Sequence, residues 1–397
     1  MITEFQNFYD DIYDDLKEGS DIILSKINYK TTKFSLKNVS AYIKEDKIGQ
    51  GTFGEVFKMK HIETGKLYAL KRIKYETELE GFPITSLREV KILQALKHDN
   101  IVKLHEVCWN NPTPSSKNRP EFFLVFDLCD HDLSGILSDT QFQFNLAQRK
   151  TIILHILKGL HYLHRKEIIH RDIKTSNILI DHQGIVKIGD FGLARLLTSQ
   201  VKHMGKARFT GRVVTLWYRP PEILLNYNDY DCSVDMWSAG CVFAELWKRE
   251  ALMMGRTELA QLALITKLCG SITEKVWPGV SKYDELKKLT LKNEPRNVLK
   301  SLGAFIDNNL AVDLIDKLLI LNPKDRITAN EALGHEFFKT EPLCADLRQM
   351  KIKGHCYEYK MHKQNSEMEH LMNQNRNNRE RNLKLFKDHQ SVCERKY

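Results

Sequence analysis

Three glycines fall within six residues at Gly49-Gln50-Gly51-Thr52-Phe53-Gly54, and the segment that follows them decides between two folds. In dinucleotide-binding domains a helix begins directly after such a motif, so that its N-terminus can hold a pyrophosphate. Here residues 55–60 and 67–71 are both typical of strands, and the turn sequence Glu63-Thr64-Gly65 leaves no room for a helix between them. We therefore expect a hairpin whose glycine-rich tip closes over phosphates, with Lys71 as a nearby cation. A plain turn and a nicotinamide-dependent dehydrogenase are the alternatives.

The rest of the chain changes from a β-rich to an α-rich pattern near residue 130. Apolar residues recur at helical spacing from about Thr85 and predict one helix there, while residues 101–107 and 122–127 are typical of strands. Farther on, an apolar stripe over 153–163 predicts a helix, and the almost wholly apolar segment 234–247 predicts a second, centrally buried one. We expect an α+β fold with a small, mainly β lobe and a larger, mainly α lobe.

Charge separates both ends of the chain from this folded part. The net charge of the chain is +9. Residues 347–397 hold twelve Lys and Arg against six Asp and Glu, and they lack the regular apolar patterning of the preceding part. We expect an N-terminal extension at 1–41, the two lobes at 42–128 and 129–340, and a flexible basic tail at 341–397. For the tail, RNA binding is the alternative to a solvated surface role.

The composition argues against several classes of protein. The most apolar stretch, 237–247, is too short to span a membrane and contains Glu245, and the first residues lack the basic start of a signal peptide. The eight cysteines form no C-x-x-C pair. We therefore expect free thiols in a reducing compartment, no structural zinc and no membrane partner.

The motif with the most chemistry is His170-Arg171-Asp172-Ile173-Lys174-Thr175-Ser176-Asn177, and Asp190-Phe191-Gly192 follows it after a short strand. Phosphoryl transfer needs in-line positioning of the reactants, cations on the phosphates and a base for the acceptor hydroxyl. The order and spacing of these motifs resemble those of the eukaryotic protein kinases over residues 42–338. The resemblance implies a bilobal kinase fold that uses ATP and Mg²⁺.

The same resemblance implies a role for each residue of these two motifs. Asp172 would be the catalytic base, and Lys174 would steady the γ-phosphate. Asn177 and Asp190 would hold Mg²⁺.

Lys71 would grip the α- and β-phosphates while pairing with a glutamate of the predicted helix. Leu93 and Leu96 follow Glu89 by four and seven residues, so Glu89 lies on the inward face of that helix and can reach Lys71. A pseudokinase scaffold is the alternative, and the presence of these catalytic residues argues against it.

By resemblance, the nucleotide pocket is drawn mainly from the β-rich lobe. The glycines of the lid are Gly49, Gly51 and Gly54. The adenine would lie between Ile48, Val56, Ala69 and Leu179. Phe126 would be the gatekeeper, Asp127 and Cys129 would offer backbone hydrogen bonds, and Asp132 would meet the ribose. Simple core packing is the alternative for the apolar members of this set.

The segment Pro83-Ile84-Thr85-Ser86-Leu87-Arg88-Glu89 resembles the cyclin-facing helix of the cyclin-dependent kinases. Glu80-Gly81-Phe82 and the residues 51–57 and 126–133 resemble the transcriptional branch of that family. The resemblance implies a T-type cyclin as partner and a K-type cyclin as the alternative, which residues 173–179 suggest. It also implies a nuclear role in transcription elongation, with the C-terminal domain of RNA polymerase II as substrate.

The segment from Asp190 to Glu222 resembles a kinase activation segment, with Thr210 as its activating phosphorylation site. Three arginines would converge on that phosphate, namely Arg88, Arg171 and Arg195. Val213-Val214 resembles the platform for a substrate proline, and Thr215 would bond to Asp172 and Lys174. A proline-directed serine/threonine kinase is therefore expected.

Overall fold

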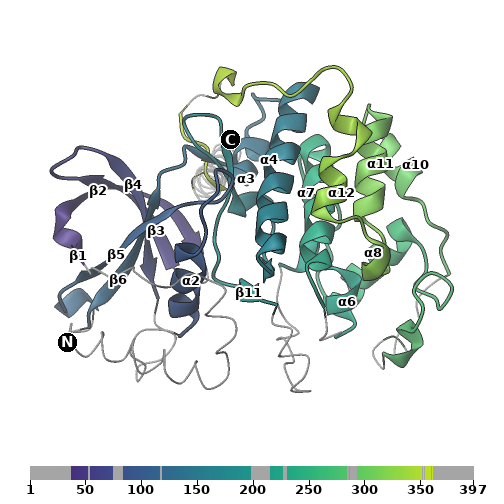
Figure 1. The fold of residues 1–397 in the computed structure, drawn as a ribbon, viewed down its shortest axis with the longest axis horizontal. Coiled ribbons are helices and arrows are strands. Elements are labelled where there is room, and N and C mark those ends of the chain that lie inside the picture. The colour runs from purple at the N-terminus through teal and green to yellow at the C-terminus, as the bar shows by residue number, and fades with distance from the viewer. Residues whose placement is uncertain are drawn as a thin grey trace, which may run out of the picture.

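The computed structural model arranges the chain in a β-rich lobe and a helical lobe, which lie side by side in Figure 1. It describes residues 37–51, 54–74, 84–116, 119–197, 215–226, 230–283, 286, 293–350, 352, 354–358 and 360. The arrangement confirms the predicted α+β, bilobal fold. Within the described residues, no helix combines the length and the apolar character needed to cross a membrane.

A six-stranded sheet forms the body of the N-lobe, in the order β1-β5-β6-β4-β3-β2. Its strands are β1 (Lys37–Asn38), β2 (Tyr42–Gly51), β3 (Gly54–His61), β4 (Leu67–Ile73), β5 (Leu104–Asn110) and β6 (Glu121–Asp127). Neighbours pair antiparallel apart from β1 and β5. Because β3 begins directly at Gly54, the strand predicted after the glycines is confirmed and a dinucleotide-binding fold is excluded.

The register between β3 and β4 directs Lys71 into the cleft between the lobes. Val56 pairs with Lys71, and side chains alternate along a strand, so Val56, Ala69 and Lys71 share one face. At the start of β3 the two backbones approach closely. A Cβ on Gly54 would lie 2.1 Å from the carbonyl oxygen of Arg72, so only glycine permits this approach.

Helix α2 (Ile84–Gln94) packs one face against this sheet. Leu87 and Val90 are buried in a cluster with residues of β4, β5 and β6. Glu89, between them, is also buried, at 3% exposure. The sheet and the helix together therefore fix the distance between Glu89 and Lys71.

The C-lobe is built from helices around α7. Its helices are α3 (Leu133–Ser138), α4 (Leu146–Arg165), α6 (Pro221–Leu224), α7 (Ser233–Lys248), α8 (Glu258–Cys269), α10 (Val298–Gly303), α11 (Asn309–Leu318) and α12 (Ala329–Leu333). Short strands carry the functional loops: β7 (His131–Asp132), β8 (Ile168–Ile169), β9 (Ile178–Ile180), β10 (Val186–Ile188) and β11 (Arg195–Leu196). Residues Val234 to Leu246 of α7 are all buried, which confirms the central helix predicted there. This helix packs against α4 and α11.

The first part of the predicted tail is packed against the C-lobe instead of being flexible. Leu347 is buried in the 3₁₀ helix η8 (Leu347–Gln349). The backbone of this helix lies close to Gly184, because a Cβ on Gly184 would lie only 2.7 Å from Arg348 N. Cys356 and Tyr357 are also buried, at 5% and 4% exposure. The described residues of the predicted tail up to 360 therefore pack on the folded lobes through buried side chains and backbone contacts, which composition does not reveal.

Candidate active site

A cavity of about 620 Å³ lies between the two lobes. Every residue predicted for nucleotide binding lines it: Ile48, Gly49, Gly51, Gly54, Val56, Ala69, Lys71, Phe126, Asp127, Cys129, Asp132 and Leu179. So do the residues predicted for catalysis and metal binding: Glu89, Asp172, Lys174, Asn177, Asp190 and Thr215. The structure thus gathers into one space side chains that are spread over more than 160 residues of sequence.

Lys71 links the two lobes inside this cavity. Its Nζ lies 2.8 Å from Glu89 Oε1 and 2.7 Å from Asp190 Oδ1. Burial opposes the charged form of Lys71, but the carboxylates of Asp190 and Glu89 outweigh burial and raise the pKa of Lys71 above its ordinary value. Lys71 therefore stays protonated at neutral pH, as a group that neutralises phosphate charge must.

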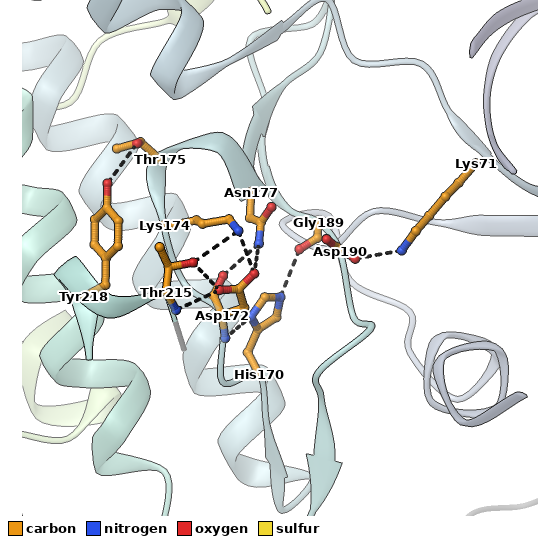
Figure 2. Close-up of polar contacts among 10 residues, drawn as sticks. All are labelled: Lys71, His170, Asp172, Lys174, Thr175, Asn177, Gly189, Asp190, Thr215 and Tyr218. Atoms are coloured by element: carbon orange, nitrogen blue, oxygen red, sulfur yellow. Dashed lines mark hydrogen bonds and ion pairs between the residues drawn. The ribbon is translucent and has the colours of Figure 1, made fainter. Parts of the chain in front are cut away.

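The carboxylate of Asp172 in the catalytic loop contacts Lys174 and Asn177 of the same loop and Thr215 from a later segment (Figure 2). Lys174 Nζ lies 2.9 Å from Asp172 Oδ2, and the Thr215 hydroxyl donates to Asp172 Oδ1 at 3.0 Å. Lys174 also donates to Thr215 Oγ1 at 3.3 Å. The bonds that the sequence predicts from Thr215 to both residues are confirmed. A base, a cation and a hydroxyl therefore meet at one point.

Helix α7 fixes the start of this loop through the side chain of Asp235. Asp235 accepts hydrogen bonds from the backbone N–H of His170 at 2.9 Å and from that of Arg171 at 2.8 Å. Arg171 has a φ of 66°, an unusual conformation for a residue with a side chain, and these bonds stabilise it. His170 contacts the Gly189 carbonyl at 2.9 Å, so the same loop also positions the segment that carries Asp190.

Asn177 and Asp190 fit a hard divalent cation. Both offer oxygen ligands, which Mg²⁺ prefers. The Asn177 amide nitrogen donates to Asp172 O at 2.8 Å and to Asp172 Oδ2 at 3.0 Å, which turns its amide oxygen the other way. Lys71 and burial act in opposite directions on Asp190. The lysine prevails and holds the pKa of Asp190 below its usual range, so this ligand is ionised.

The side of the cavity that is predicted to hold adenine is apolar. Ile48 and Ala69 form a buried cluster that Val56 and Phe126 extend. At its edge, burial raises the pKa of Asp132 to about 7, although its carboxylate accepts a backbone hydrogen bond from Gly135 at 2.7 Å. The apolar walls and one polar edge are what a purine and its ribose require.

Sequence reasoning missed one wall of this cavity, which we call the strap: residues 354–358 and 360. Tyr357 and Glu358 line the cavity. The Tyr357 hydroxyl donates to the carbonyl oxygen of Cys129 at 2.7 Å, and Glu358 N donates to Asp132 Oδ2 at 2.8 Å. The strap therefore already bonds to two of the residues predicted to meet the nucleotide. Its sequence carries no motif that announces this contact.

The three arginines predicted to bind a phosphate lie close to one another but outside the cavity. Burial, together with the neighbouring charges of Arg88 and Arg171, lowers the pKa of Arg195 to about 10. Arg171 also donates to Leu193 O and to the Tyr230 hydroxyl. The predicted phosphorylation site, Thr210, and the predicted proline platform, Val213-Val214, lie outside the described residues.

Comparison with known proteins defines the class of protein first. The protein kinase domain family matches residues 42–338, and the chain belongs to this family. Such kinases use ATP and a divalent metal.

Similar proteins then narrow the class. Cyclin-dependent kinase 9-B of Xenopus laevis is 51% identical over 329 residues, which cover 81% of this chain and 87% of that protein. Cyclin-dependent kinase 9 of Homo sapiens is 51% identical over 313 residues, covering 79% of this chain and 84% of that protein. The chain is a cyclin-dependent serine/threonine kinase of the transcriptional branch.

A solved structure gives the same result. The crystal structure of the yeast RNA Pol II CTD kinase CTDK-1 complex matches with a TM-score of 0.69 and 36% identity, covering 80% of this chain and 99% of that chain. The kinase fold therefore rests on sequence and structure together.

Proposed function

We propose that this chain phosphorylates serine or threonine before proline in the C-terminal domain of RNA polymerase II, in the nucleus, and that it promotes transcription elongation. The observation that carries the proposal is the joint geometry of Lys71 with Glu89 and of Asp172 with Thr215, inside one nucleotide-sized cavity. The similarity to cyclin-dependent kinase 9 and to an RNA Pol II CTD kinase supports the choice of substrate.

In this proposal each residue acts on a defined part of the reaction. Asp172 accepts the proton of the substrate hydroxyl, and Lys174 offsets charge that develops on the transferred phosphoryl group. Lys71 binds the α- and β-phosphates while Glu89 fixes its position. Asn177 and Asp190 hold Mg²⁺, which when bound neutralises phosphate charge. Thr215 keeps the Asp172 carboxylate turned toward the acceptor.

The proposed activation step joins a cyclin to the phosphate of Thr210. A cyclin on α2 would hold Glu89 at Lys71 and would also hold the adjacent Arg88 beside Arg171 and Arg195. A phosphate supplies about −1.5 to −2 charges and acceptor oxygens for such a cluster. Besides burial, the charges of Arg88 and Arg171 lower the pKa of Arg195, and this crowding of three cations supports an anion as their common partner.

We propose a T-type cyclin as the partner and a K-type cyclin as the second candidate. The similarity to cyclin-dependent kinase 9 favours the first. Purification of the tagged chain from its own cells, followed by identification of the cyclin that co-elutes in stoichiometric amount, decides between them.

The substrate proposal is tested with the cyclin complex and two peptides that differ only at one position, Ser-Pro against Ser-Ala. We expect efficient phosphorylation of the Ser-Pro peptide and little of the Ser-Ala peptide, because proline has no N–H to leave unsatisfied in an apolar platform. Asp172→Asn is the matched inactive control. Equal rates on both peptides would overturn the proline-directed proposal, and transfer to tyrosine would overturn the serine/threonine acceptor.

A further inference from the structure

A second carboxylate of α7, Glu245, is buried at 6% exposure and takes no part in the chemistry described above. Both of its oxygens accept hydrogen bonds from hydroxyl groups. Thr175 donates to Oε1 at 3.1 Å, and Tyr218 donates to Oε2 at 2.8 Å. The two hydroxyl oxygens lie 3.3 Å apart, a contact visible in Figure 2. Three buried polar groups therefore form a closed triangle.

The two hydroxyls come from two different segments of the catalytic centre. Thr175 follows Lys174 in the catalytic loop and is buried at 3% exposure. Tyr218 ends the 3₁₀ helix η4 (Leu216–Tyr218), and its N–H donates to the Thr215 carbonyl at 2.9 Å. Glu245 thus accepts one hydrogen bond from Thr175, the neighbour of Lys174, and one from Tyr218, in the turn that begins at Thr215.

Helix α7 is a rigid base for this triangle. Ser238 lies two turns before Glu245 on the same face, and its hydroxyl donates to the Tyr218 carbonyl at 2.9 Å. Asp235, ten residues or about 15 Å before Glu245, holds the start of the catalytic loop. One buried helix therefore anchors the loop near both ends and also anchors the turn that carries Thr215.

We propose that Glu245, Thr175 and Tyr218 are positioning residues that keep the substrate platform in register with the catalytic loop. Through them, Thr215 and Lys174 stay within hydrogen-bond distance of Asp172 when a peptide binds. The inference rests on the proposed roles of Asp172 and Thr215. Hydrogen bonds to a buried carboxylate are strong, and removal of one donor leaves that carboxylate partly unsatisfied. The network acts on the peptide side, so nucleotide binding should be independent of it.

The first test compares single-hydroxyl variants of the full-length cyclin complex in steady-state kinetics. Thr175→Val keeps the shape of the side chain but removes the hydroxyl, and we expect kcat on a Ser-Pro peptide to fall about ten-fold. The KM for ATP should stay within two-fold. Thr175→Ser restores the hydroxyl and should recover most of the lost kcat. A loss that serine does not recover, or an equal loss in ATP binding, would overturn the proposal.

Thr266→Val is the matched control. Thr266 is also buried at 3% exposure, but its hydroxyl bonds only within α8, to the Ala263 carbonyl at 3.0 Å among the described residues. We expect wild-type kinetics from this variant. Thr175→Val behaving like Thr266→Val would contradict the positioning role. Asp172→Asn, measured in the same assay, separates this failure from failure of the proposed function, because only the latter leaves that variant active.

The second test is a double-mutant cycle of Thr175→Val and Tyr218→Phe. Because both hydroxyls donate to one carboxylate, we expect the double variant to lose clearly less than the product of the two single losses. Losses that simply multiply would show two independent contacts and would overturn the network. The unfolding temperature of each complex is measured alongside, and only variants within two degrees of the wild type enter the cycle, with Glu245→Gln as a replacement for either member.

Discussion

The catalytic loop and the strap both line the nucleotide cavity, yet they differ in how far their side chains reveal what they do. The loop contributes Asp172, Lys174 and Asn177, each with a side chain that its chemistry demands. The strap bonds partly through backbone groups, including Glu358 N on Asp132 and the Cys356 carbonyl, which accepts from Asp132 N at 3.0 Å, and partly through side chains such as that of Tyr357. Almost any sequence can supply the backbone groups, and one tyrosine is no motif.

The comparison also separates two kinds of contribution to the reaction. In the proposed mechanism the loop residues touch the reacting atoms, so their loss should lower turnover. Strap residues extend the wall around the nucleotide, so their loss should change nucleotide binding and leave turnover intact. Substitutions in the two segments should therefore change different kinetic parameters.

The largest effect is expected from Asp172→Asn. The amide keeps the shape of the side chain but cannot accept the proton of the substrate hydroxyl, so kcat should fall by roughly 10²–10⁴-fold. The KM for ATP should change little, because Asp172 is on the acceptor side of the cavity. Steady-state kinetics of the cyclin complex measure both. Unchanged turnover would remove Asp172 from the role of base.

A smaller loss, about 10- to 100-fold in turnover, is expected from Thr210→Ala in the cyclin complex, because a phosphate there would form charge-assisted bonds to several arginines. Arg88→Ala should cause a similar loss and should make the enzyme insensitive to the state of Thr210. A double-mutant cycle on Thr210 and Arg88 measures the coupling. Simple addition of the two losses in free energy would mean that Arg88 does not contact this phosphate.

The same contrast explains which features of the structure could be predicted from the sequence. The hairpin at Gly54 and the reach of Glu89 to Lys71 follow from residue types at fixed spacing, and the placing of Thr215 on Asp172 follows from the family resemblance. All three agree with the structure. The ion pair was accessible because helical periodicity alone puts Glu89 on the inward face. In these cases a local sequence pattern predicts a contact between residues that are far apart in the chain.

The strap and Glu245 could not be found in this way. Tyr357 meets the carbonyl of Cys129, 228 residues earlier in the chain, through a hydroxyl that nothing in its neighbourhood singles out. Glu245 interrupts an apolar helix and is noticeable only as a charge in a buried segment. A buried carboxylate needs partners, so that charge is the one signal that could have pointed to Thr175 and Tyr218.

Removal of the strap tests the other half of the comparison. A chain that ends at Met350 loses the contacts of Tyr357 with the apolar adenine wall, where Tyr357 is buried at 4% exposure with Ile48. We expect the KM for ATP to rise about five-fold, since part of an apolar wall is lost, and kcat on a short peptide to stay within two-fold. A collapse of kcat in a folded truncation would show that the strap also acts on the chemistry.

Gly135→Ala should reproduce a part of that effect without shortening the chain. A Cβ on Gly135 would lie 2.6 Å from the carbonyl carbon and 2.7 Å from the carbonyl oxygen of Cys356, so the strap must shift away. Alanine favours the helical conformation that residue 135 has in α3, so this helix itself should not be destabilised. We expect a two- to three-fold rise in the KM for ATP. As the control, Gly135→Ala in the truncated chain, which has no strap to displace, should leave the KM for ATP unchanged.

The smallest effect is expected at the far end of the strap, where Lys360 Nζ lies 2.6 Å from Asp46 Oδ2 on β2. This pair joins the strap to the N-lobe, but both side chains are partly exposed, at 30% and 51%, and such pairs contribute about 0–1 kcal/mol. Lys360→Ala should therefore raise the KM for ATP less than two-fold, and 0.5 M salt should abolish the difference from the wild type. Lys58→Ala, which removes an ion pair with Glu45 within the β2–β3 hairpin, controls for a general effect of charge on this sheet. An effect as large as that of the truncation would mean that the ion pair, and not the ring of Tyr357, holds the strap over the nucleotide.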